Sequence, residues 1–386
     1  MTQSQKRIGL VGLSASGSWA SRSHLAYLRT TPYYTITALQ NSSKASAEAA
    51  AKEYSLPSVS THADTSSLAA DPNVDIVAVS VNVQGHYDVI KPALSAGKDV
   101  FAEWPLARNV AEAVELTALA KEKGVRTLVG LQARQSPTVL KAREFVKSGK
   151  LGKILSSTMH GYGVICSPVT TKDFEYTNAI ENGANLVTIP MGHATDALCF
   201  VLGEFTGLSA TIANHFPEIV MLDKEFKPAG TVKKTAHDYV AFTGTLVDGG
   251  VVDVTYSGGT SHYGKDFFWE INGTDGSLVM ENAKIQTPGP ATGGHIQMSQ
   301  PTLKFVPKKE NPFAPAVALE DVEVEKAGEW DQGDMSFGVG KAWDAFAGVG
   351  LDKGYTVTTF EDALVRHKMI EAIYRSAEKG TRESYL

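Results

Sequence analysis

The sequence predicts an α/β protein of two domains: an N-terminal domain with a doubly wound parallel sheet, and a C-terminal α+β domain with a large, mostly antiparallel open sheet. Apolar strand-like runs alternate with helical segments as far as Leu131, and continuous apolar runs indicate strands buried on both faces. Beyond Ser148 the strand-like segments are joined by Gly and Asp turns. Because 386 residues exceed one ordinary core, we place the domains at 1–135 and 136–386.

Local signals justify the N-terminal elements. The Ala-rich stretch 44–54 favours a helix, and Ser42 or Ser43 suits its N-cap. Two further helices are expected to stop at Gly97 and Gly124, because glycine adopts the left-handed conformation that ends many helices. The expected strands are 8–13, 34–39, 75–81, 99–102 and 126–131, and the expected helices are 16–28, 44–54, 86–96, 110–123 and 138–148.

The C-terminal domain is predicted to consist mainly of strands. The segment 287–316 is rich in Pro, Gly and Gln and is expected to be a loop. Strands are expected to begin near Lys153, Leu208, Tyr239, Gly250, Phe267 and Gly276, and helices are expected at 184–202, 330–346 and 360–378.

Composition excludes several classes of protein. The formal net charge is −6 without a block of like charge, which argues against direct binding of nucleic acid or of an anionic membrane. The apolar runs are shorter than the roughly 20 residues that span a bilayer. Cys166 and Cys199 cannot form a disulfide framework, and the polar start 1–7 contains no signal peptide, so a cytoplasmic location is expected.

No metal site is expected. The histidines outside the N-terminal domain are scattered among strand-like segments without a repeated metal spacing. They include His215, His237, His262 and His295.

A glycine-rich turn follows the first strand. In Gly12-Leu13-Ser14-Ala15-Ser16-Gly17, Gly12 can make the tight turn and Gly17 can let the helix pack close to the sheet. Ser14 takes the position where the backbone approaches a pyrophosphate, and its hydroxyl can bond a phosphate oxygen at the helix N-terminus. We therefore assign Gly12, Ser14, Ser16 and Gly17 to the phosphates of a dinucleotide in a Rossmann domain.

The end of the second strand carries information on the cofactor. An NAD-preferring protein usually places an acidic residue there, but the sequence has Gln40, Asn41, Ser42, Ser43 and Lys44. Two hydroxyls and a cation suit a 2′-phosphate, so we expect NADP(H), with NAD(H) as the alternative. The plainer alternative is that the serines only cap the helix and Lys44 is solvated.

Several landmarks occur in a fixed order along the chain. They are the Gly12 turn, the strand 77–81 leading to Asn82 and His86, Ala102-Glu103-Trp104-Pro105-Leu106-Ala107, Gly130-Leu131-Gln132-Ala133-Arg134, Gly192-His193-Ala194-Thr195-Asp196 and Thr359-Phe360-Glu361-Asp362-Ala363. In this order the chain resembles the glucose–fructose oxidoreductase, inositol dehydrogenase and MocA (Gfo/Idh/MocA) family over nearly its whole length. The resemblance implies an NAD(P)-binding Rossmann domain and a second domain for substrate and dimerisation. The cofactor contacts that it implies outside the glycine turn are Trp19, Val81, Asn82, His86, Glu103, Trp104, Gln132 and Arg134.

Two departures set the sequence apart within the family. Gly17-Ser18-Trp19-Ala20 and Glu103-Trp104-Pro105 are similar to the fungal branch that contains the yeast galactose-regulon repressor. Family enzymes usually carry Glu-Lys-Pro, and the resemblance implies that this lysine shuttles the substrate proton. Indole cannot, so Trp104 is expected to shape the nicotinamide pocket. Ile189 stands where family enzymes commonly carry Asp.

His193 is the best acid or base candidate. Asp196 lies three residues later and would share its helical face, where a carboxylate could orient or charge the imidazole. We place His193, Asp196 and Glu103 in the catalytic set. The alternative is that His193 and Asp196 form a satisfied polar pair, and the residues that could compensate for the missing partners are His160, Tyr162, Tyr176 and Lys265.

These observations support three hypotheses. The first is an NADP(H)-preferring oxidoreductase acting on a small polar carbonyl or alcohol, such as a sugar or a secondary metabolite. The second is a non-catalytic NAD(P)-binding regulator that contacts a protein partner, and the third is a lyase or isomerase without net redox change. A homodimer is expected because an open sheet would expose an apolar face for a second copy.

Overall fold

The computed structural model describes residues 5–282, 294–311, 313–324 and 336–386. It divides into two compact units. Unit 1 comprises Met1–Gln132 and Asp334–His367, and unit 2 comprises Ala133–Gly333 and Lys368–Leu386. Each unit is therefore built from two separate pieces of chain, whereas the expected division at 135 assigned the whole C-terminal half to one domain.

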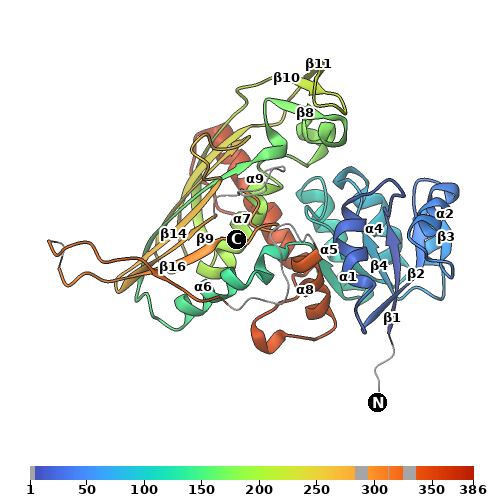
Figure 1. The fold of residues 1–386 in the computed structure, drawn as a ribbon, viewed down its shortest axis with the longest axis horizontal. Coiled ribbons are helices and arrows are strands. Elements are labelled where there is room, and N and C mark those ends of the chain that lie inside the picture. The colour runs from blue at the N-terminus through green and yellow to red at the C-terminus, as the bar shows by residue number, and fades with distance from the viewer. Residues whose placement is uncertain (1–4, 283–293, 312, 325–335) are drawn as a thin grey trace. The chain divides into compact units, whose positions relative to one another are not determined.

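Unit 1 contains a six-stranded sheet in the order β3-β2-β1-β4-β5-β6, with every pairing parallel (Figure 1). The strand order reverses between β1 and β4, which makes a switch point where α/β sheets bind ligands at the carboxyl ends of their strands. The predicted doubly wound parallel sheet is confirmed. The strands are β1 Lys6–Val11, β2 Tyr34–Gln40, β3 Ser60–His62, β4 Ile76–Val79, β5 Asp99–Ala102 and β6 Thr127–Val129.

Helices cover both faces of this sheet (Figure 1). Ile8 and Leu10 of β1 belong to a core cluster with residues of the first two helices and α8, while Gly9 between them lies against Leu68 of α3 on the other face. The helices of the first face are η1 Ser21–Leu25 with α1 Ala26–Leu28, α2 Lys44–Glu53 and α8 Ser336–Phe346. The remaining ones are α3 Thr65–Ala69, α4 His86–Ser95 and α5 Val110–Lys123.

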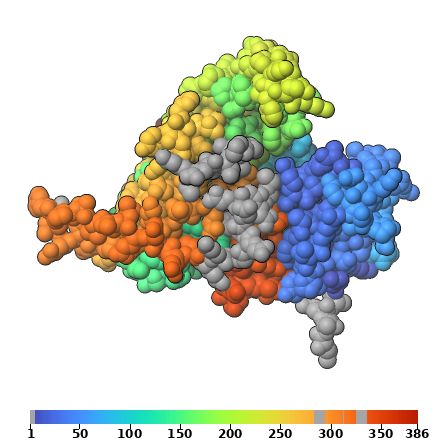
Figure 2. Space-filling model, in the orientation of Figure 1, coloured from blue at the N-terminus to red at the C-terminus, as the bar shows by residue number. Residues whose placement is uncertain are grey.

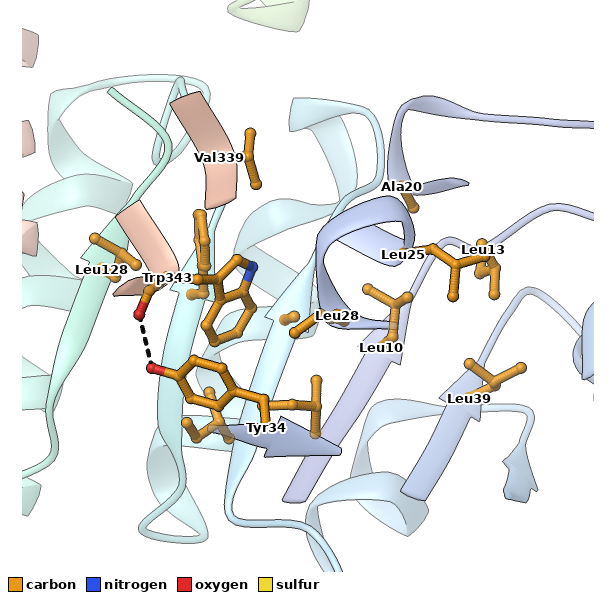
Figure 3. Close-up of a cluster of buried hydrophobic side chains, with 14 of the residues drawn as sticks. Leu10, Leu13, Ala20, Leu25, Leu28, Tyr34, Leu39, Leu128, Val339 and Trp343 are labelled. Atoms are coloured by element: carbon orange, nitrogen blue, oxygen red, sulfur yellow. Dashed lines mark hydrogen bonds between the residues drawn. The ribbon is translucent and has the colours of Figure 1, made fainter. Parts of the chain in front are cut away.

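Trp343 of α8 lies at the centre of the unit 1 core (Figure 3). The indole is fully buried, and its ring centroid lies 4.7 Å from those of Tyr34 and Phe101. The Tyr34 hydroxyl donates a hydrogen bond of 2.9 Å to the Trp343 carbonyl. A helix from the C-terminal half thus completes the core of the N-terminal sheet. The start of the expected helix at 330–335 lies outside the described residues.

Unit 2 contains an eight-stranded sheet in the order β17-β16-β15-β14-β7-β13-β12-β9. Only β7 and β13 pair in parallel, so the predicted large, mostly antiparallel sheet is confirmed. The strands are β7 Ile154–Gly163, β9 Phe205–Ala213, β12 Tyr239–Leu246, β13 Val251–Gly258, β14 Phe267–Gly273, β15 Gly276–Glu281, β16 Thr302–Pro307 and β17 Glu320–Asp321. The helices are α6 Pro137–Lys147, α7 Pro190–Leu202 and α9 Phe360–Lys379, of which α9 passes from unit 1 into unit 2 at His367.

The half-buried side chains of β7, in the middle of the large sheet, bear on the apolar face that was expected there. The half-buried positions of β7 carry Ile154, Ser156, Thr158, His160 and Tyr162, and Val251, Asp253 and Thr255 of β13 lie beside Ser156, Thr158 and His160. Polar and hydroxyl side chains therefore dominate this register. The homodimer stays a prediction.

Parts of unit 2 differ from the expected elements. The segment 287–316 was expected to be a loop, but its described part contains β16, whose alternating Leu303 and Phe305 face the core. The chain between β16 and β17 projects from the sheet, and Phe313 on it is 97% exposed (Figures 1 and 2). A small sheet in the order β11-β10-β8 was not predicted, and its strands are β8 Val169–Thr171, β10 Glu218–Leu222 and β11 Pro228–Lys233.

The helix expected at 184–202 begins only at Pro190. Asn185 prevents an earlier start, because its side-chain oxygen accepts hydrogen bonds from the backbone N–H groups of Val187 and Thr188. Proline then suits the first helical turn, where its missing N–H has no partner to lose. Within the described part of the chain, no helix has the length and apolar character needed to span a membrane.

Candidate functional site

Gly12 begins the turn at the switch point of unit 1. Its φ is 93°, a left-handed conformation that glycine adopts without strain. A Cβ at this position would lie 2.2 Å from the carbonyl oxygen of Ser80 at the end of β4. Gly12 is therefore required both by its conformation and by the close approach of two strand ends. This is the backbone cradle that a pyrophosphate needs.

Gly17 has a different role from the expected one. It also has a positive φ, of 92°, but a Cβ at this position would have no other atom within 4 Å. Close packing of the helix on the sheet therefore does not require glycine here, and the backbone conformation does. The helical segment that follows includes the π-helical turn η1, instead of the regular helix expected from residue 16.

Hydroxyl groups gather on this turn. The Ser14 and Ser16 hydroxyls lie 2.9 Å apart at the exposed surface, and the Ser16 N–H donates to Ser14 Oγ over 3.3 Å. The turn is anchored from behind by Tyr54 and Asn41, whose side chains donate to the carbonyls of Ser14 and Leu13. Exposed hydroxyls on an anchored turn can donate to phosphate oxygens, so these residues fit the phosphates of a dinucleotide.

The carboxyl end of β2 offers no carboxylate between Gln40 and Lys44. Ser43 caps α2, because its hydroxyl accepts the Ser46 N–H at 3.1 Å while Ser46 Oγ accepts the Ser43 N–H. Ser42 and Lys44 are exposed beside this cap. The capping role is therefore present for Ser43, and Ser42 and Lys44 are the side chains available to a ribose substituent.

His86 is buried behind the end of β4. Its two ring nitrogens lie 2.8 Å from the Pro105 carbonyl oxygen and 2.9 Å from the Val81 carbonyl oxygen. Burial lowers the pKa of His86. The imidazole thus joins two loops of unit 1, a structural role that the assignment of His86 and Val81 to the cofactor did not foresee. Asn82 follows Val81, at the start of a short 3-10 turn, and its cofactor role stays a prediction.

The Glu103 carboxylate is held by two side chains that the sequence did not connect. Trp19 Nε1 donates to Glu103 Oε1 over 2.8 Å, and His24 Nε2 lies 2.7 Å from the same oxygen. Trp343 Nε1 donates to His24 Nδ1 over 3.1 Å. Because indole can only donate, His24 Nδ1 must accept, so the His24 hydrogen is on Nε2 and points at Glu103.

The second oxygen of Glu103 lies against Gly130, where a Cβ would be only 2.5 Å from it. These contacts fix the carboxylate within unit 1, and the catalytic and cofactor roles expected for Glu103 stay predictions. We refer below to Trp19, His24, Glu103 and Trp343 as the Glu103 network.

Trp104 packs inside unit 1. It is 6% exposed, and its ring centroid lies 4.8 Å from that of His367. The Ala107 N–H donates to His367 Nε2 over 3.4 Å. Burial, together with the charge of His86, lowers the pKa of His367 to about 3. Gln132, another expected cofactor contact, has a buried Oε1 without a hydrogen-bond partner.

Asp196 of α7 pairs with Arg134 in unit 2. Arg134 donates from Nε to Asp196 Oδ2 over 2.8 Å and from Nη2 to Oδ1 over 2.7 Å. The Asp196 side chain is fully buried in this bidentate pair. Asp196 therefore pairs with Arg134, a partner that the sequence did not connect to it, and the cofactor role expected for Arg134 and the catalytic role expected for Asp196 stay predictions.

His193 lies one turn before Asp196 on α7 and is 4% exposed. Its Nδ1 is buried without a hydrogen-bond partner. Burial, reinforced by His295, lowers the pKa of His193 to about 3, so the ring is neutral at pH 7. The sequence missed His295, because only the fold brings it near His193.

The residues that could compensate for the missing catalytic partners have contacts of their own in unit 2. Lys265 forms an ion pair of 2.6 Å with Glu281. His160 packs edge-on against Tyr162, and burial lowers its pKa. Burial raises the pKa of Tyr176 to about 12. Among the residues that the structure describes, no three His, Cys, Asp or Glu side chains form a group that could hold a metal ion.

Together, a glycine turn at the switch point of a parallel sheet and a second unit with a large mixed sheet define a dinucleotide-binding oxidoreductase fold. Residues 6–131 match the oxidoreductase family with an NAD-binding Rossmann fold, and residues 137–282 match the C-terminal domain of Gal80p. The chain belongs to this NAD-binding Gfo/Idh/MocA oxidoreductase family, as the order of landmarks in the sequence indicated.

Relatives of two kinds cover nearly the whole chain. It is 34% identical to dehydrogenase aclE of Aspergillus oryzae over 98% of each chain. It is 29% identical to the galactose/lactose metabolism regulatory protein GAL80 of Saccharomyces cerevisiae, over 97% of this chain and 93% of that protein. The crystal structure of a super-repressor mutant of Gal80p from the same yeast superposes with a TM-score of 0.86, 25% identity, and coverage of 99% and 98%.

Proposed function

We propose that the protein is an NADP(H)-preferring oxidoreductase that interconverts a hydroxyl and a carbonyl group on a small polar molecule. The observation that carries this proposal is His193, a neutral buried imidazole with a nitrogen that no protein group satisfies. An unpartnered buried nitrogen costs stability, and such a cost is commonly retained at functional sites.

The residues of unit 1 fit the cofactor. Gly12 provides the backbone cradle, and the hydroxyls of Ser14 and Ser16 would donate to phosphate oxygens. Ser42 and Lys44 would bind a 2′-phosphate beside the N-terminus of α2, where the helix dipole also favours an anion. When bound, the nicotinamide supplies or accepts the hydride.

His193 would handle the proton. With the ring hydrogen on Nε2, Nδ1 accepts the proton of the substrate hydroxyl during oxidation and returns it to the carbonyl oxygen during reduction. Trp104 cannot replace it, because the indole N–H donates hydrogen bonds but neither releases nor takes up a proton at neutral pH. The substrate-proton role that the resemblance assigns to lysine therefore falls to His193.

Titration with NADPH and NADH, followed by energy transfer from tryptophan to nicotinamide, tests the cofactor assignment. Lys44→Ala should weaken NADPH about tenfold and leave NADH unchanged, since only NADPH carries the charge that Lys44 would pair. Lys52→Ala, an exposed lysine on the same helix, is the matched control. Equal loss of both cofactors, or of neither, would count against the preference for NADP(H).

Oxidation of NADPH across a panel of small polar aldehydes and ketones tests the activity. Turnover should appear with at least one class and fall by about 10²-fold or more in His193→Asn, the size typical of a lost general acid or base. Absence of turnover across the panel, with NADPH bound, would favour the second candidate.

That candidate is a non-catalytic regulator whose bound dinucleotide tunes a contact with another protein. Trp104 favours it, because the packed indole stands where family enzymes carry lysine. The GAL80 relative, named as a regulatory protein, adds to this case. Turnover that depends on His193 separates the two: the enzyme oxidises NADPH and loses this activity in His193→Asn, whereas the regulator binds NADPH without oxidising it.

A further inference from the structure

Two arginines of unit 2 lie against the same aromatic ring. The Arg143 guanidinium, on α6, lies 3.8 Å from the centroid of the Phe200 ring on α7, and the Arg134 guanidinium lies 5.4 Å from it. At the shorter distance a flat guanidinium stacks on the ring, whose face attracts its charge. Phe200 therefore holds the Arg143 side chain in a defined place.

The two arginines differ in how their charges are offset. Arg134 has its bidentate pair with Asp196. In the part of the chain that the structure describes, no carboxylate pairs with Arg143, and its Nε is buried without a hydrogen-bond partner. Burial, and then the charge of Arg134, lower the pKa of Arg143, yet a guanidinium stays protonated at pH 7. Arg143 therefore carries a positive charge that no described protein group offsets.

The surroundings of Arg143 leave it open to a ligand. Arg143 and Phe200 are only half-buried. The acidic residue next along the chain, Glu144, pairs instead with Lys141, whose Nζ lies 2.9 Å from both carboxylate oxygens. Lys147 is exposed, and residues four apart lie on the same side of a helix. A second cation thus lies one turn from Arg143.

Stacking and hydrogen bonding use different parts of a guanidinium. The Phe200 ring covers a face of the Arg143 group, whereas the N–H groups point outward in its plane. These N–H groups form a fork that fits two oxygens of a phosphate or carboxylate group. Arg143 can therefore bind an oxyanion while it stays stacked on Phe200, and its partial burial strengthens the attraction.

We propose that Arg143 and Lys147 form a site in unit 2 that binds the phosphate or carboxylate group of a small molecule. Phe200 positions Arg143 in this site. Because Phe200 follows His193 by seven residues on α7, the two lie about 10 Å apart along the helix axis. The oxyanion site is therefore distinct from His193, and it does not depend on the proposed oxidoreductase activity.

Binding of inorganic phosphate and of acetate to the full chain tests the site, by phosphorus NMR for phosphate and saturation-transfer NMR for acetate. Chloride keeps the ionic strength constant, because screening alone would change the response. Arg143→Met should weaken the binding of at least one anion by about tenfold or more. Lys121→Met, at an exposed position on α5 of unit 1, is the control and should leave binding unchanged.

The measured quantity is the difference between the wild type and Arg143→Met, because phosphate can also bind at the glycine turn of unit 1. A loss confined to phosphate assigns the site to a phosphate group, and a loss confined to acetate assigns it to a carboxylate. Unchanged binding of both anions in Arg143→Met would overturn the proposal.

Thermal unfolding separates binding from folding. Arg143→Met removes the unpartnered Nε and keeps an unbranched side chain against Phe200, so the Tm in chloride should be unchanged or higher. The anion that binds should raise the Tm of the wild type, and this rise should shrink in Arg143→Met. If Arg143→Met fails to fold, exposed Lys147→Ala decides: binding about threefold weaker supports the site, and unchanged binding overturns it.

Discussion

The Glu103 network of unit 1 and the histidines His193 and His295 of unit 2 use buried polar groups in opposite ways. In the first, Glu103 Oε1 receives two donors and both nitrogens of His24 are bonded. In the second, His193 Nδ1 and His295 Nε2 are buried with no partner. Partnered groups hold the fold, whereas unpartnered ones cost stability and are expected where a ligand completes them. Substitutions should therefore separate stability from binding.

The largest effect on stability is expected at Asp196, one helical turn from His193. Asp196→Ala would leave the Arg134 charge buried without its bidentate partner, which should lower the free energy of unfolding by about 3–5 kcal/mol. His193→Phe on the same helix should change it by less than about 1 kcal/mol, because it removes an unsatisfied atom. Urea denaturation of both variants measures the difference. Equal losses in the free energy of unfolding would mean that His193 also stabilises the fold, which would contradict the difference proposed between partnered and unpartnered groups.

A smaller loss is expected at the centre of the Glu103 network. Glu103→Ala leaves the N–H groups of His24 and Trp19 without an acceptor, which should cost about 2–3 kcal/mol in total since Trp19 is only half-buried. Glu103→Gln keeps an acceptor oxygen and should lose less. The comparison is made by urea denaturation, with Glu48→Ala on exposed α2 as the control. A stable Glu103→Ala protein that fails only in turnover would instead support the catalytic role expected for Glu103.

The fold was predictable where the signal is local. Apolar runs predicted β1, β2, β4, β5 and β6, and strand-like segments joined by Gly and Asp turns predicted β7, β9, β12, β13, β14 and β15. Short elements such as β3 and the small sheet β11-β10-β8 were missed because runs of three to six residues carry little periodicity. Membership of α8 in unit 1 depends on tertiary packing around Trp343, which no local pattern contains.

The site was predictable in its parts and not in its partners. The glycine turn and His193 stand in recognisable motifs. His24 lies 79 residues from Glu103 in the sequence, and Trp343 lies 319 residues from His24. Only the folded chain brings these side chains together. Asp196 shows the same limit, because helical spacing put it near His193 while Arg134, 62 residues away, holds its carboxylate.

The pH dependence of stability sharpens the contrast further. The pKa values of His193, about 3, and His295, about 4, lie below the roughly 6.5 of an unfolded chain. Between about pH 6.5 and pH 4 the unfolded chain therefore binds protons that the folded chain does not. The free energy of unfolding should therefore decrease as the pH is lowered through this range, by up to about 1.4 kcal/mol per pH unit for each such histidine.

Urea denaturation at pH 7, 6 and 5 checks this slope. His367, with a pKa of about 3, contributes to it as well, so the wild-type protein sums several histidines. His295→Phe removes one of them and should flatten the slope by one histidine's share. An unchanged slope would show that His295 is as easily protonated in the folded protein as in the unfolded one.

The smallest effect concerns two neighbouring serines at the end of β2. Ser43 is partnered through the cap of α2, so Ser43→Ala should cost about 1 kcal/mol in urea denaturation, whereas exposed Ser42→Ala should stay within about 0.5 kcal/mol. If the contrast between partnered and unpartnered groups holds here too, Ser42→Ala should weaken NADPH binding and leave stability alone. Loss of NADPH affinity only in Ser43→Ala would instead mean that the cap orients α2 and that Ser42 contributes nothing to cofactor preference.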